Sequence, residues 1–245
     1  MIQEGVLKEP APKLMIAQHV HPPLEVGKVG IRSGNYMASA DEIYITVKGK
    51  GGHGGLPHLC IDPVVVTAVI IETLQTIVSR NSDPTIPSVL TFGKINSKGG
   101  ATNIIPDEVY LEGTFRTMDE NWRRQAHGLI KDRVNYIAKS MGAEVDVNIM
   151  VGYPTLHNDL KLTQKVQSTM IEYLGEQNVE ELPVRMTAED FAFYSRELPT
   201  CFYRLGTGNR SKNITSPVHT STFDIDEEAL AVGSGLMAYL ALECL

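Results

Sequence analysis

The chain has 245 residues, of which 42% are hydrophobic and 21% charged, with a net charge of −7 and a pI near 5.5. This composition supports a real core and argues against wholesale disorder. The acidic charge argues against general affinity for nucleic acids, which requires clustered Lys and Arg. The three scattered cysteines, Cys60, Cys201 and Cys244, argue against a disulfide framework or a CxxC metal site. They favour a reducing, cytoplasmic location.

Neither end of the chain predicts a membrane segment. The first ten residues, MIQEGVLKEP, lack the apolar core of a signal peptide. Only 229–245 resembles a span, but it is shorter than the ~20 residues that a membrane helix needs. It also follows an acidic run, 224–228. We therefore expect a buried terminal helix there and no membrane association.

The N-terminal flank predicts a short helical piece followed by two short strands, at 13–20 and 26–31. The middle of the chain then alternates between strands and helices. Polar and apolar residues alternate in 41–48 and 144–151, the latter with Val145, Val147, Ile149 and Val151 inward. Further strands are expected at 88–95 and 109–117.

Two long helices are expected between these strands. Asp62-Pro63 is a strong helix start and the apolar stripe runs to about Arg80. Asp119 caps the second helix, which Gly142 ends. The resulting order, β-α-β-β-α-β, is a ferredoxin-like layout over about 38–153.

The C-terminal flank predicts three helices and one strand. Asp159 begins an amphipathic helix that Gly175 closes, and a short helix follows from Thr187 to about Leu198, with Thr187 and Asp190 in capping-box spacing. A strand at 201–206 and a terminal helix after Asp226 complete it. Residues 1–37 and 154–245 would together form a second domain, with few strands for a sheet.

Two isolated histidines are candidate metal ligands. His19 is expected at a strand end before Pro22-Pro23, and His219 in a loop that leads into a helix. Ligands that come from distant segments are typical of catalytic metal sites rather than of zinc fingers. The alternative for each is a histidine bonded to a backbone carbonyl. No carboxylate motif or Glu-Glu pair is assigned beside these two histidines to complete a site.

Three further polar residues lie beside glycines near predicted strand ends, and together they suit recognition of a carboxylate or a polarised carbonyl. His53 lies in a glycine-rich run that is alternatively a flexible hairpin loop. Asn103 presents an amide from a loop, or simply forms a turn. Arg116 suits bidentate carboxylate binding, or is an ordinary surface arginine. Glu189 and Asp190 fit a helix start better than acid chemistry.

These positions together resemble the M20 metallopeptidase and amidohydrolase family, most closely its aminoacylase and hippurate-hydrolase branch, which includes auxin-conjugate hydrolases. The matching segments, in family order, are Gln18-His19-Val20-His21-Pro22, Gly51-Gly52-His53-Gly54-Gly55 with Asp62-Pro63, Gly100-Ala101-Thr102-Asn103-Ile104-Ile105-Pro106, Gly113-Thr114-Phe115-Arg116, Thr187-Ala188-Glu189-Asp190-Phe191, and Val218-His219-Thr220-Ser221 before Phe223-Asp224. Each motif alone is weak, but the ordered set is specific.

The resemblance implies a role for each candidate. His19, rather than His21, and His219 would be metal ligands. His53 would reach across a dimer to the partner's active site and help to hold the substrate carbonyl or oxyanion. Asn103 and Arg116 would bind the carboxylate end of the substrate.

For the fold, the resemblance implies an α/β (α+β) architecture. The ferredoxin-like unit would be a lid and dimerisation domain at 38–153, inserted in a remnant of a zinc-peptidase-like catalytic domain. The expected activity is hydrolysis of amide bonds in N-acyl amino acids or small peptide-like substrates. Two divalent ions, zinc or else manganese, cobalt or nickel, would serve the complete enzyme.

The family's earlier ligand motif and Glu-Glu pair are absent from this chain. We therefore expect a C-terminal portion that is inactive alone and that holds metal poorly or not at all. One alternative is a non-catalytic dimerisation or binding module. Another is an RNA-binding domain of the same β-α-β-β-α-β order, which would use Tyr44 and Tyr110 on the open sheet face; the net negative charge argues against it.

Overall fold

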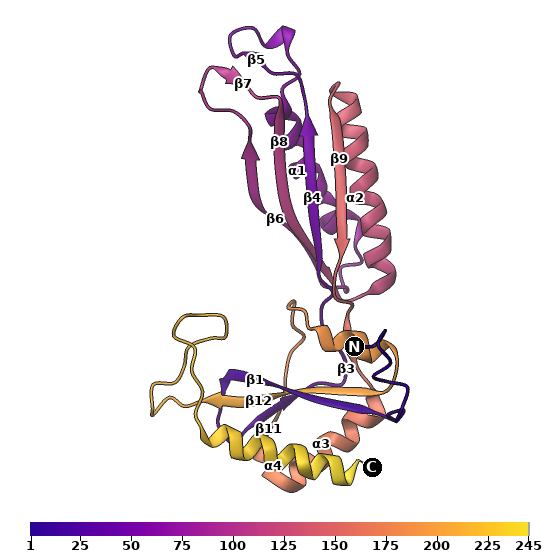
Figure 1. The fold of residues 1–245 in the computed structure, drawn as a ribbon, viewed down its shortest axis with the longest axis vertical. Helices are drawn as coiled ribbons and strands as arrows, with labels where there is room; N and C mark the ends of the chain where they lie inside the picture. Colours follow the sequence, from indigo (N-terminus) through magenta and orange to yellow (C-terminus); the bar gives the residue numbers. More distant parts are fainter. Residues whose placement is uncertain (245) are drawn as a thin grey trace. The chain divides into compact units, whose positions relative to one another are not determined.

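The computed structural model describes residues 1–244, which divide into two compact units (Figure 1). Unit 1 comprises Met1–Met37, Leu156–Arg185 and the chain from Glu189 onward. Unit 2 comprises Ala38–Thr155 together with the short segment Met186–Ala188, whose place in this unit the sequence did not indicate. Each unit has its own core and is described by itself.

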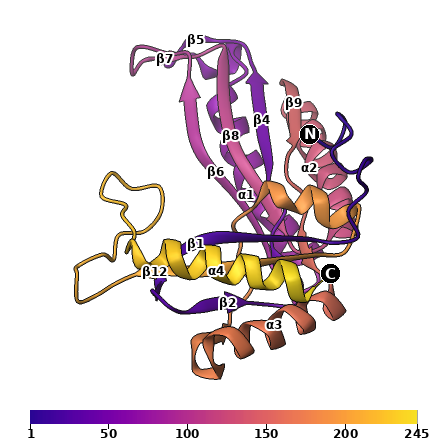
Figure 2. The same ribbon diagram turned by 60° about the horizontal axis from the view of Figure 1, so that its bottom comes forward.

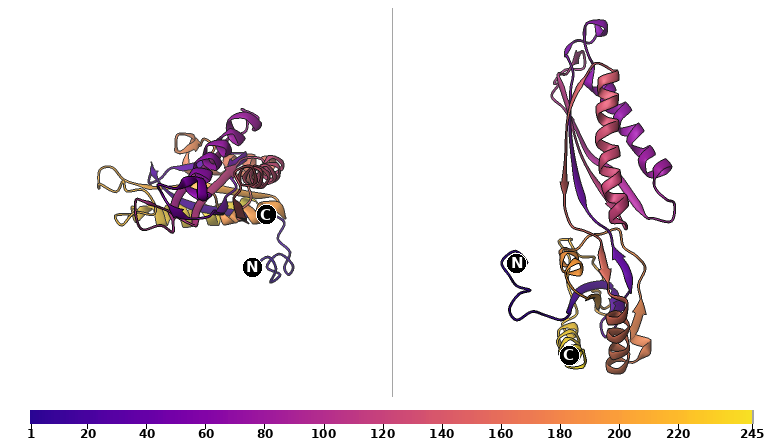
Figure 3. Two further views of the ribbon diagram at one scale, coloured as in Figure 1. Left: turned by 90° about the horizontal axis from the view of Figure 1, so that it is seen from above. Right: turned by 90° about the vertical axis from the view of Figure 1, so that its right-hand side faces the viewer.

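Unit 2 is an antiparallel four-stranded sheet in the order β6-β8-β4-β9. Along the chain its main elements follow the order β-α-β-β-α-β. Both helices cover the same face of the sheet (Figure 3). The elements are β4 (Asp41–Lys48), α1 (Pro63–Asn81), β6 (Ser88–Ser97), β8 (Glu108–Thr117), α2 (Glu120–Ser140) and β9 (Glu144–Val151).

Local signals set the limits of both helices in unit 2. The Asp62 side chain accepts a hydrogen bond from the backbone N–H of Val64, and Pro63 is the first helical residue. Asp119 in the same way accepts from the N–H of Trp122. Gly142, with φ of +76°, turns the chain after α2 in a conformation that costs other residues energy.

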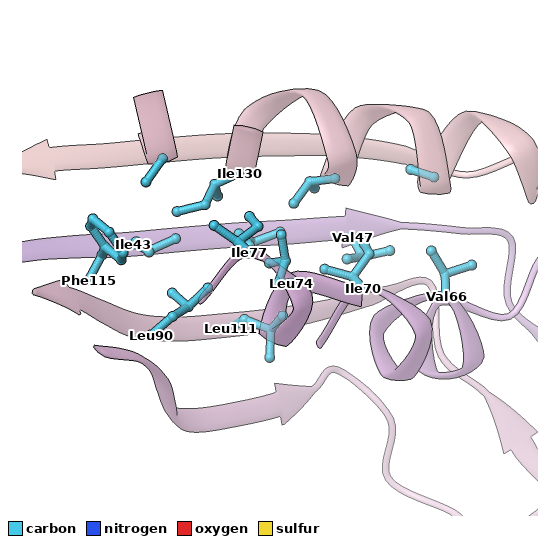
Figure 4. Packing of buried hydrophobic residues seen from close by; sticks show 14 of the residues in the cluster. Ile43, Val47, Val66, Ile70, Leu74, Ile77, Leu90, Leu111, Phe115 and Ile130 are labelled. Atoms are coloured by element: carbon cyan, nitrogen blue, oxygen red, sulfur yellow. The ribbon is translucent and has the colours of Figure 1, made fainter. Parts of the chain in front are cut away.

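The core of unit 2 lies between the helices and the covered sheet face (Figure 4). Alternation places Ile43, Ile45 and Val47 on this face of β4, and all three are fully buried. The largest side chains that meet them are Ile70, Leu74, Ile77, Leu111, Phe115 and Ile130. One expectation was wrong: Val151, the last residue of the edge strand β9, is 67% exposed.

A small ribbon lies beyond the start of β8 and adds to the four-stranded plan. It pairs β5 (Gly52–His53) with β7 (Ile104–Ile105) in antiparallel fashion, and a 3-10 turn, η1 (Pro57–Leu59), follows β5. The ribbon joins the two glycine-containing loops that carry His53 and Asn103. It therefore brings together two segments that are about fifty residues apart in sequence.

A buried charged network ties the two ends of unit 2 together. Asp41 is fully buried and accepts hydrogen bonds from Arg123, one of them from Nε at 2.9 Å, and from Nε2 of His127 at 2.7 Å. The backbone N–H of Gly152 donates to Asp41 at 3.1 Å. Glu120 binds Arg123 and accepts from the N–H of Thr155 at 2.8 Å. The network thus links three segments of unit 2: the start of β4, helix α2, and the chain that follows β9.

Asp41 gives unit 2 a predictable sensitivity to acid. Burial alone would raise its pKa, but the hydrogen bonds from Arg123 and His127 outweigh burial and lower the pKa from 3.8 to about 2. Since the folded pKa lies below the unfolded one, the carboxylate stabilises the fold above pH ~4. That contribution, about 2 kcal/mol, is lost as the pH falls from ~4 towards 2. Urea unfolding followed by Trp122 fluorescence should show this loss, and Asp41→Asn should flatten it. An unchanged acid profile in the variant would contradict the assignment.

Unit 1 is built on a four-stranded sheet in the order β1-β12-β2-β11. The long strands β1 and β12 pair in parallel. A separate two-stranded antiparallel ribbon pairs β10 with β3. The strands are β1 (Met15–Glu25), β2 (Val29–Ile31), β3 (Gly34–Met37), β10 (Leu156–Asn158), β11 (Val179–Glu181) and β12 (Thr200–Gly208).

Strand β12 is buried along its whole length, and its two faces have different neighbours. Cys201, Tyr203 and Leu205 pack against α3 (Leu160–Leu174) and α4 (Glu228–Glu243). Figure 2 shows α4 running beside β12. On the other face, Phe202 joins a second apolar cluster that includes Tyr36 and Phe191. Phe202 and Arg204, which alternate with Tyr203 along β12, therefore lie on the face that carries the candidate site.

Three expectations for unit 1 were wrong. The first ten residues form turns rather than a helical piece. The strand expected at 26–31 is present as β2, but the sheet gains a fourth strand, β11, which was not predicted. Thr187 does not cap a helix: the cap is Glu189, whose side chain accepts from the N–H of Asp190 at the start of the 3-10 helix η3 (Asp190–Arg196). A second 3-10 turn, η2 (Glu176–Asn178), precedes β11.

Among the described residues, one helix is long and apolar enough to cross a membrane by length and composition, and it is α1. In unit 2 this helix packs on the sheet through Val66, Ile70, Leu74 and Ile77. The expected terminal helix is α4, which is buried at Ala229, Leu236 and Leu240. Leu245, the last residue of that expectation, lies outside the described part of the chain.

Candidate functional sites

The sequence predicted His19 at the end of a strand, but in the structure it lies within β1. Its register partner is Arg204 of β12, and pairing resumes at Glu25 after an irregularity that follows His21. The strand continues through Pro22 and Pro23 because β1 is an edge strand, where a missing N–H costs no ladder bond. His19 shares its sheet face with Phe202, whose ring centroid lies 6.1 Å from its own.

The surroundings of His19 leave one ring nitrogen available. Its Nδ1 lies 2.7 Å from the backbone oxygen of Val20, so the neutral ring donates there and carries its lone pair on Nε2. Nε2 lies 3.9 Å from a carboxylate oxygen of Glu189. Burial lowers the pKa of His19, and the charge of Arg204 lowers it further. This is the state that a metal ligand needs, with the carbonyl fixing the ring.

His219 lies in an exposed loop of the same unit, with φ of +64°. It is near enough to His19 for its charge to act on the pKa of that residue. Unit 1 therefore brings His19, Glu189 and His219 into one region. Among residues 1–244, however, no cluster of three or more His, Cys, Asp or Glu side chains has the geometry to hold a metal ion.

Two arginines near the histidines of β1, Arg185 and Arg204, were not predicted from the sequence. Arg204 is only 5% exposed, and its charge and that of Arg185 reach His21, which is 7% exposed. Burial first, and then these two arginines, lower the pKa of His21 to about 4. The signal available in the sequence was a charged residue within the apolar strand 201–206, where a buried charge demands compensation.

His53 and Asn103 lie together at the ribbon end of unit 2. The N–H of Gly55 donates to Nδ1 of His53 at 3.0 Å, so the neutral ring carries its proton on Nε2 and presents a donor to solvent. The N–H of Gly54 donates to the backbone oxygen of Asn103 at 2.7 Å. A Cβ at Gly54 would lie 3.0 Å from that oxygen, so this close contact favours glycine.

Arg116 lies at the opposite end of β8, half-buried at an open hollow of about 670 Å³ within unit 2. Its Nη1 donates to the backbone oxygen of Met186 at 3.3 Å. Glu42, Glu112 and Tyr44 also line the hollow. Arg116 lies eight residue steps along β8 from Glu108, or about 26 Å of extended strand. Within one copy, Arg116 therefore does not join His53 and Asn103 at a single small ligand.

A comparison with known protein families identifies the family of this chain. The sequence model described as peptidase family M20/M25/M40 matches residues 1–243. The chain belongs to this family. The motif order that suggested the resemblance is thereby confirmed, while the aminoacylase and hippurate-hydrolase branch stays a prediction.

Over the aligned segments, about a third of the residues are identical between this chain and two of its relatives. It is 36% identical over 239 residues to the N-acetyldiaminopimelate deacetylase of Enterococcus faecalis, covering 95% of this chain and 60% of that protein. It is 34% identical over 244 residues to thermostable carboxypeptidase 1 of Saccharolobus solfataricus, covering 99% of this chain and 61% of that protein. The chain thus spans about three fifths of the length of these relatives.

Solved structures have the same fold. A Staphylococcus aureus protein superposes with a TM-score of 0.88 at 29% identity, covering 99% of this chain and 61% of its own. A dinuclear metal-binding peptidase of the M20 family from Bacillus subtilis gives a TM-score of 0.77 at 27% identity, covering all of this chain and 60% of its own. The mixed α/β fold of the M20 peptidases is therefore confirmed for this chain.

Proposed function

We propose that this chain is the larger part of a metal-dependent hydrolase that cleaves amide bonds in N-acyl amino acids or small peptide-like substrates. The observation that carries the proposal is His19, whose Nδ1 is fixed by a carbonyl and whose Nε2 is free beside Glu189 and near His219. Membership of the M20 family and the deacetylase and carboxypeptidase names of its relatives support the same reaction class.

The metal-binding role falls to His19 and His219. Imidazole nitrogens suit zinc and nickel. Two divalent ions, zinc or else manganese, cobalt or nickel, are proposed for the complete enzyme. When held there, a divalent ion would supply Lewis-acid activation of the water for attack on the amide carbonyl. Two histidines hold such ions poorly without carboxylate or thiolate partners. We therefore propose that residues 1–245 alone are inactive or nearly so.

The substrate-binding role falls to His53, Asn103 and Arg116. The Nε2–H of His53 is a donor for the carbonyl oxygen, whose negative charge grows as water adds. The guanidinium of Arg116 suits the carboxylate of the substrate. Because about 26 Å of β8 separates the two ends, one substrate can meet both only when two copies contribute. His53 is accordingly assigned to the active site of a partner copy.

Unit 2 is the proposed lid and dimerisation domain, and unit 1 the proposed catalytic remnant. The ten-residue strand β6 lies at the edge of the unit 2 sheet, and its Ile95 is 58% exposed. Such an edge offers unpaired backbone groups to a second copy. It equally favours the alternative function, a non-catalytic dimerisation module. The three free cysteines fit the proposed cytoplasmic location.

The proposal is tested by assaying hydrolysis of hippurate and of N-acetyl amino acids with added zinc or manganese. Residues 1–245 should show no turnover, and a chain extended to the full length of the relatives should hydrolyse at least one of these substrates. A chelator should abolish that activity, and added metal should restore it. Robust turnover by residues 1–245 alone would refute the claim of inactivity. Metal-independent turnover by the longer chain would refute the mechanism.

A further inference from the structure

The unit 1 sheet face that carries His19 also carries an uncompensated pair of positive charges. Arg204 is 5% exposed, and its Nε has no hydrogen-bond partner. Its guanidinium lies 5.0 Å from the centre of the Phe202 ring, and Nη2 lies 3.3 Å from the sulfur of Met37. Neither neighbour neutralises the charge. A guanidinium with five donors is therefore held in the core largely by weak contacts.

Arg185 adds a second cation to the same place. Its backbone bridges to Met37, its side chain is half-buried, and its Nε is also buried without a partner. Burial lowers the pKa of Arg204, and the charge of Arg185 contributes to the lowering. The Tyr36 hydroxyl lies close enough to act on Arg204 but has no hydrogen bond of good geometry. Three buried polar atoms of this region, the Tyr36 hydroxyl and the Nε atoms of Arg185 and Arg204, are thus without a hydrogen-bond partner of good geometry.

The nearby acidic residues do not balance this pair. Among the described residues, arginine ion pairs are formed by Arg32, Arg123 and Arg210, not by Arg185 or Arg204. Glu189 acts on Arg204 from a distance, but its oxygens contact His19 and the N–H of Asp190. A buried charge without a partner is destabilising, and a bound anion would remove that penalty.

We propose that Arg185 and Arg204, with the Tyr36 hydroxyl, form a binding site for a carboxylate beside His19. A carboxylate matches the planar fork of a guanidinium better than other anions do, and both arginines have a free Nε–H to donate. We expect the anion to enter from the side of Arg185, which is half-buried, and of His19, whose side chain is 34% exposed. The carboxylate belongs either to a free organic acid or to an acidic side chain.

This site is distinct from the Arg116 hollow, which lies in unit 2. It also does not depend on the proposed hydrolase activity, because binding can be measured without metal. Succinate is a suitable probe, since it presents carboxylates of the kind that a guanidinium binds. The titration is made by calorimetry on residues 1–245 with a chelator present, at constant ionic strength set by chloride.

We expect saturable succinate binding that weakens at least tenfold in Arg204→Met and in Arg185→Gln, since each removes a charge-assisted hydrogen bond. Arg210→Gln, which changes an exposed arginine of unit 1, should bind as the parent does. Absence of saturable binding overturns the proposal. Equal binding by Arg204→Met, or loss of binding in Arg210→Gln alone, also overturns it.

Thermal unfolding provides a second readout that folding defects cannot imitate. Succinate should raise the Tm of the parent chain relative to chloride, and the Tm of Arg204→Met should not respond. A response of equal size in both proteins contradicts the proposal. Repeating the titration on a chain of the relatives' full length identifies the source of the carboxylate. Retained binding assigns a free acid, and lost binding assigns an acidic side chain of the added segment.

Discussion

Replacing Arg123 by Met is expected to lower the free energy of unfolding of unit 2 by about 3–5 kcal/mol. The substitution removes the bidentate partner of Asp41 and leaves a fully buried carboxylate with His127 and the N–H of Gly152 alone. It also frees Glu120, which binds both Arg123 and the N–H of Thr155. The loss therefore combines an unpaired buried charge with weaker anchoring of the chain where it leaves the sheet.

The measurement is chemical unfolding followed by tryptophan fluorescence. Trp122 is the only tryptophan and is adjacent to Arg123 on α2, so the signal reports unit 2 alone. Arg124→Met is the matched control, because Arg124 is exposed and contacts only its neighbour Asn121. Its effect should stay within about 0.5 kcal/mol. Equal effects of the two substitutions would show that the network is not what stabilises this region.

Replacing His53 by Ala should lower kcat of the complete enzyme at least about 100-fold while leaving the fold intact. His53 is exposed, and its Nε2–H is the group proposed to bind the developing negative charge on the substrate carbonyl. His53→Gln retains an N–H donor and should keep part of the activity. His58→Ala is the matched control, because His58 is an exposed histidine at the same end of unit 2 and has no proposed role.

Mixing two inactive variants tests whether His53 serves the partner copy. A His53→Ala subunit keeps its own His19, and a His19→Ala subunit keeps its own His53. If the two residues act across a two-fold dimer, their heterodimer contains one complete site, and a random mixture recovers about 25% of the parent activity. Light scattering should first establish that the protein is a dimer. No recovery from a mixture that forms heterodimers would place His53 and His19 in the same subunit's site.

The two buried arginines differ in a way that sequence could not indicate. Arg123 has Asp41 as a bidentate partner across 82 residues, whereas Arg204 faces Arg185 and an aromatic ring. The same substitution by Met should therefore destabilise the protein at Arg123 and spare its stability at Arg204, where it removes an uncompensated charge. Burial alone does not predict the sign of the effect; the partner does.

Helix ends and other features that depend on contacts within a few residues along the chain were predicted correctly from the sequence. The Asp62-Pro63 start of α1, the Asp119 cap of α2 and the left-handed Gly142 each depend on contacts with residues a few positions away. The alternation of β4 also identified its buried face. The ordered motifs identified the family, because they preserve residue type and sequence order, which need no coordinates.

Tertiary structure alone decided which of these motifs meet. The pairing of His19 with Arg204 joins positions 185 residues apart, and the ribbon that joins His53 to the Asn103 segment leaves Arg116 at the far end of β8. The four-stranded sheet of unit 1, likewise, required short strands from both flanks to find one another. Strand partners and register are fixed by packing between distant segments, for which the local pattern carries no information. The sequence thus determined the family and the candidate residues, and the tertiary structure determined which of them can act on one ligand.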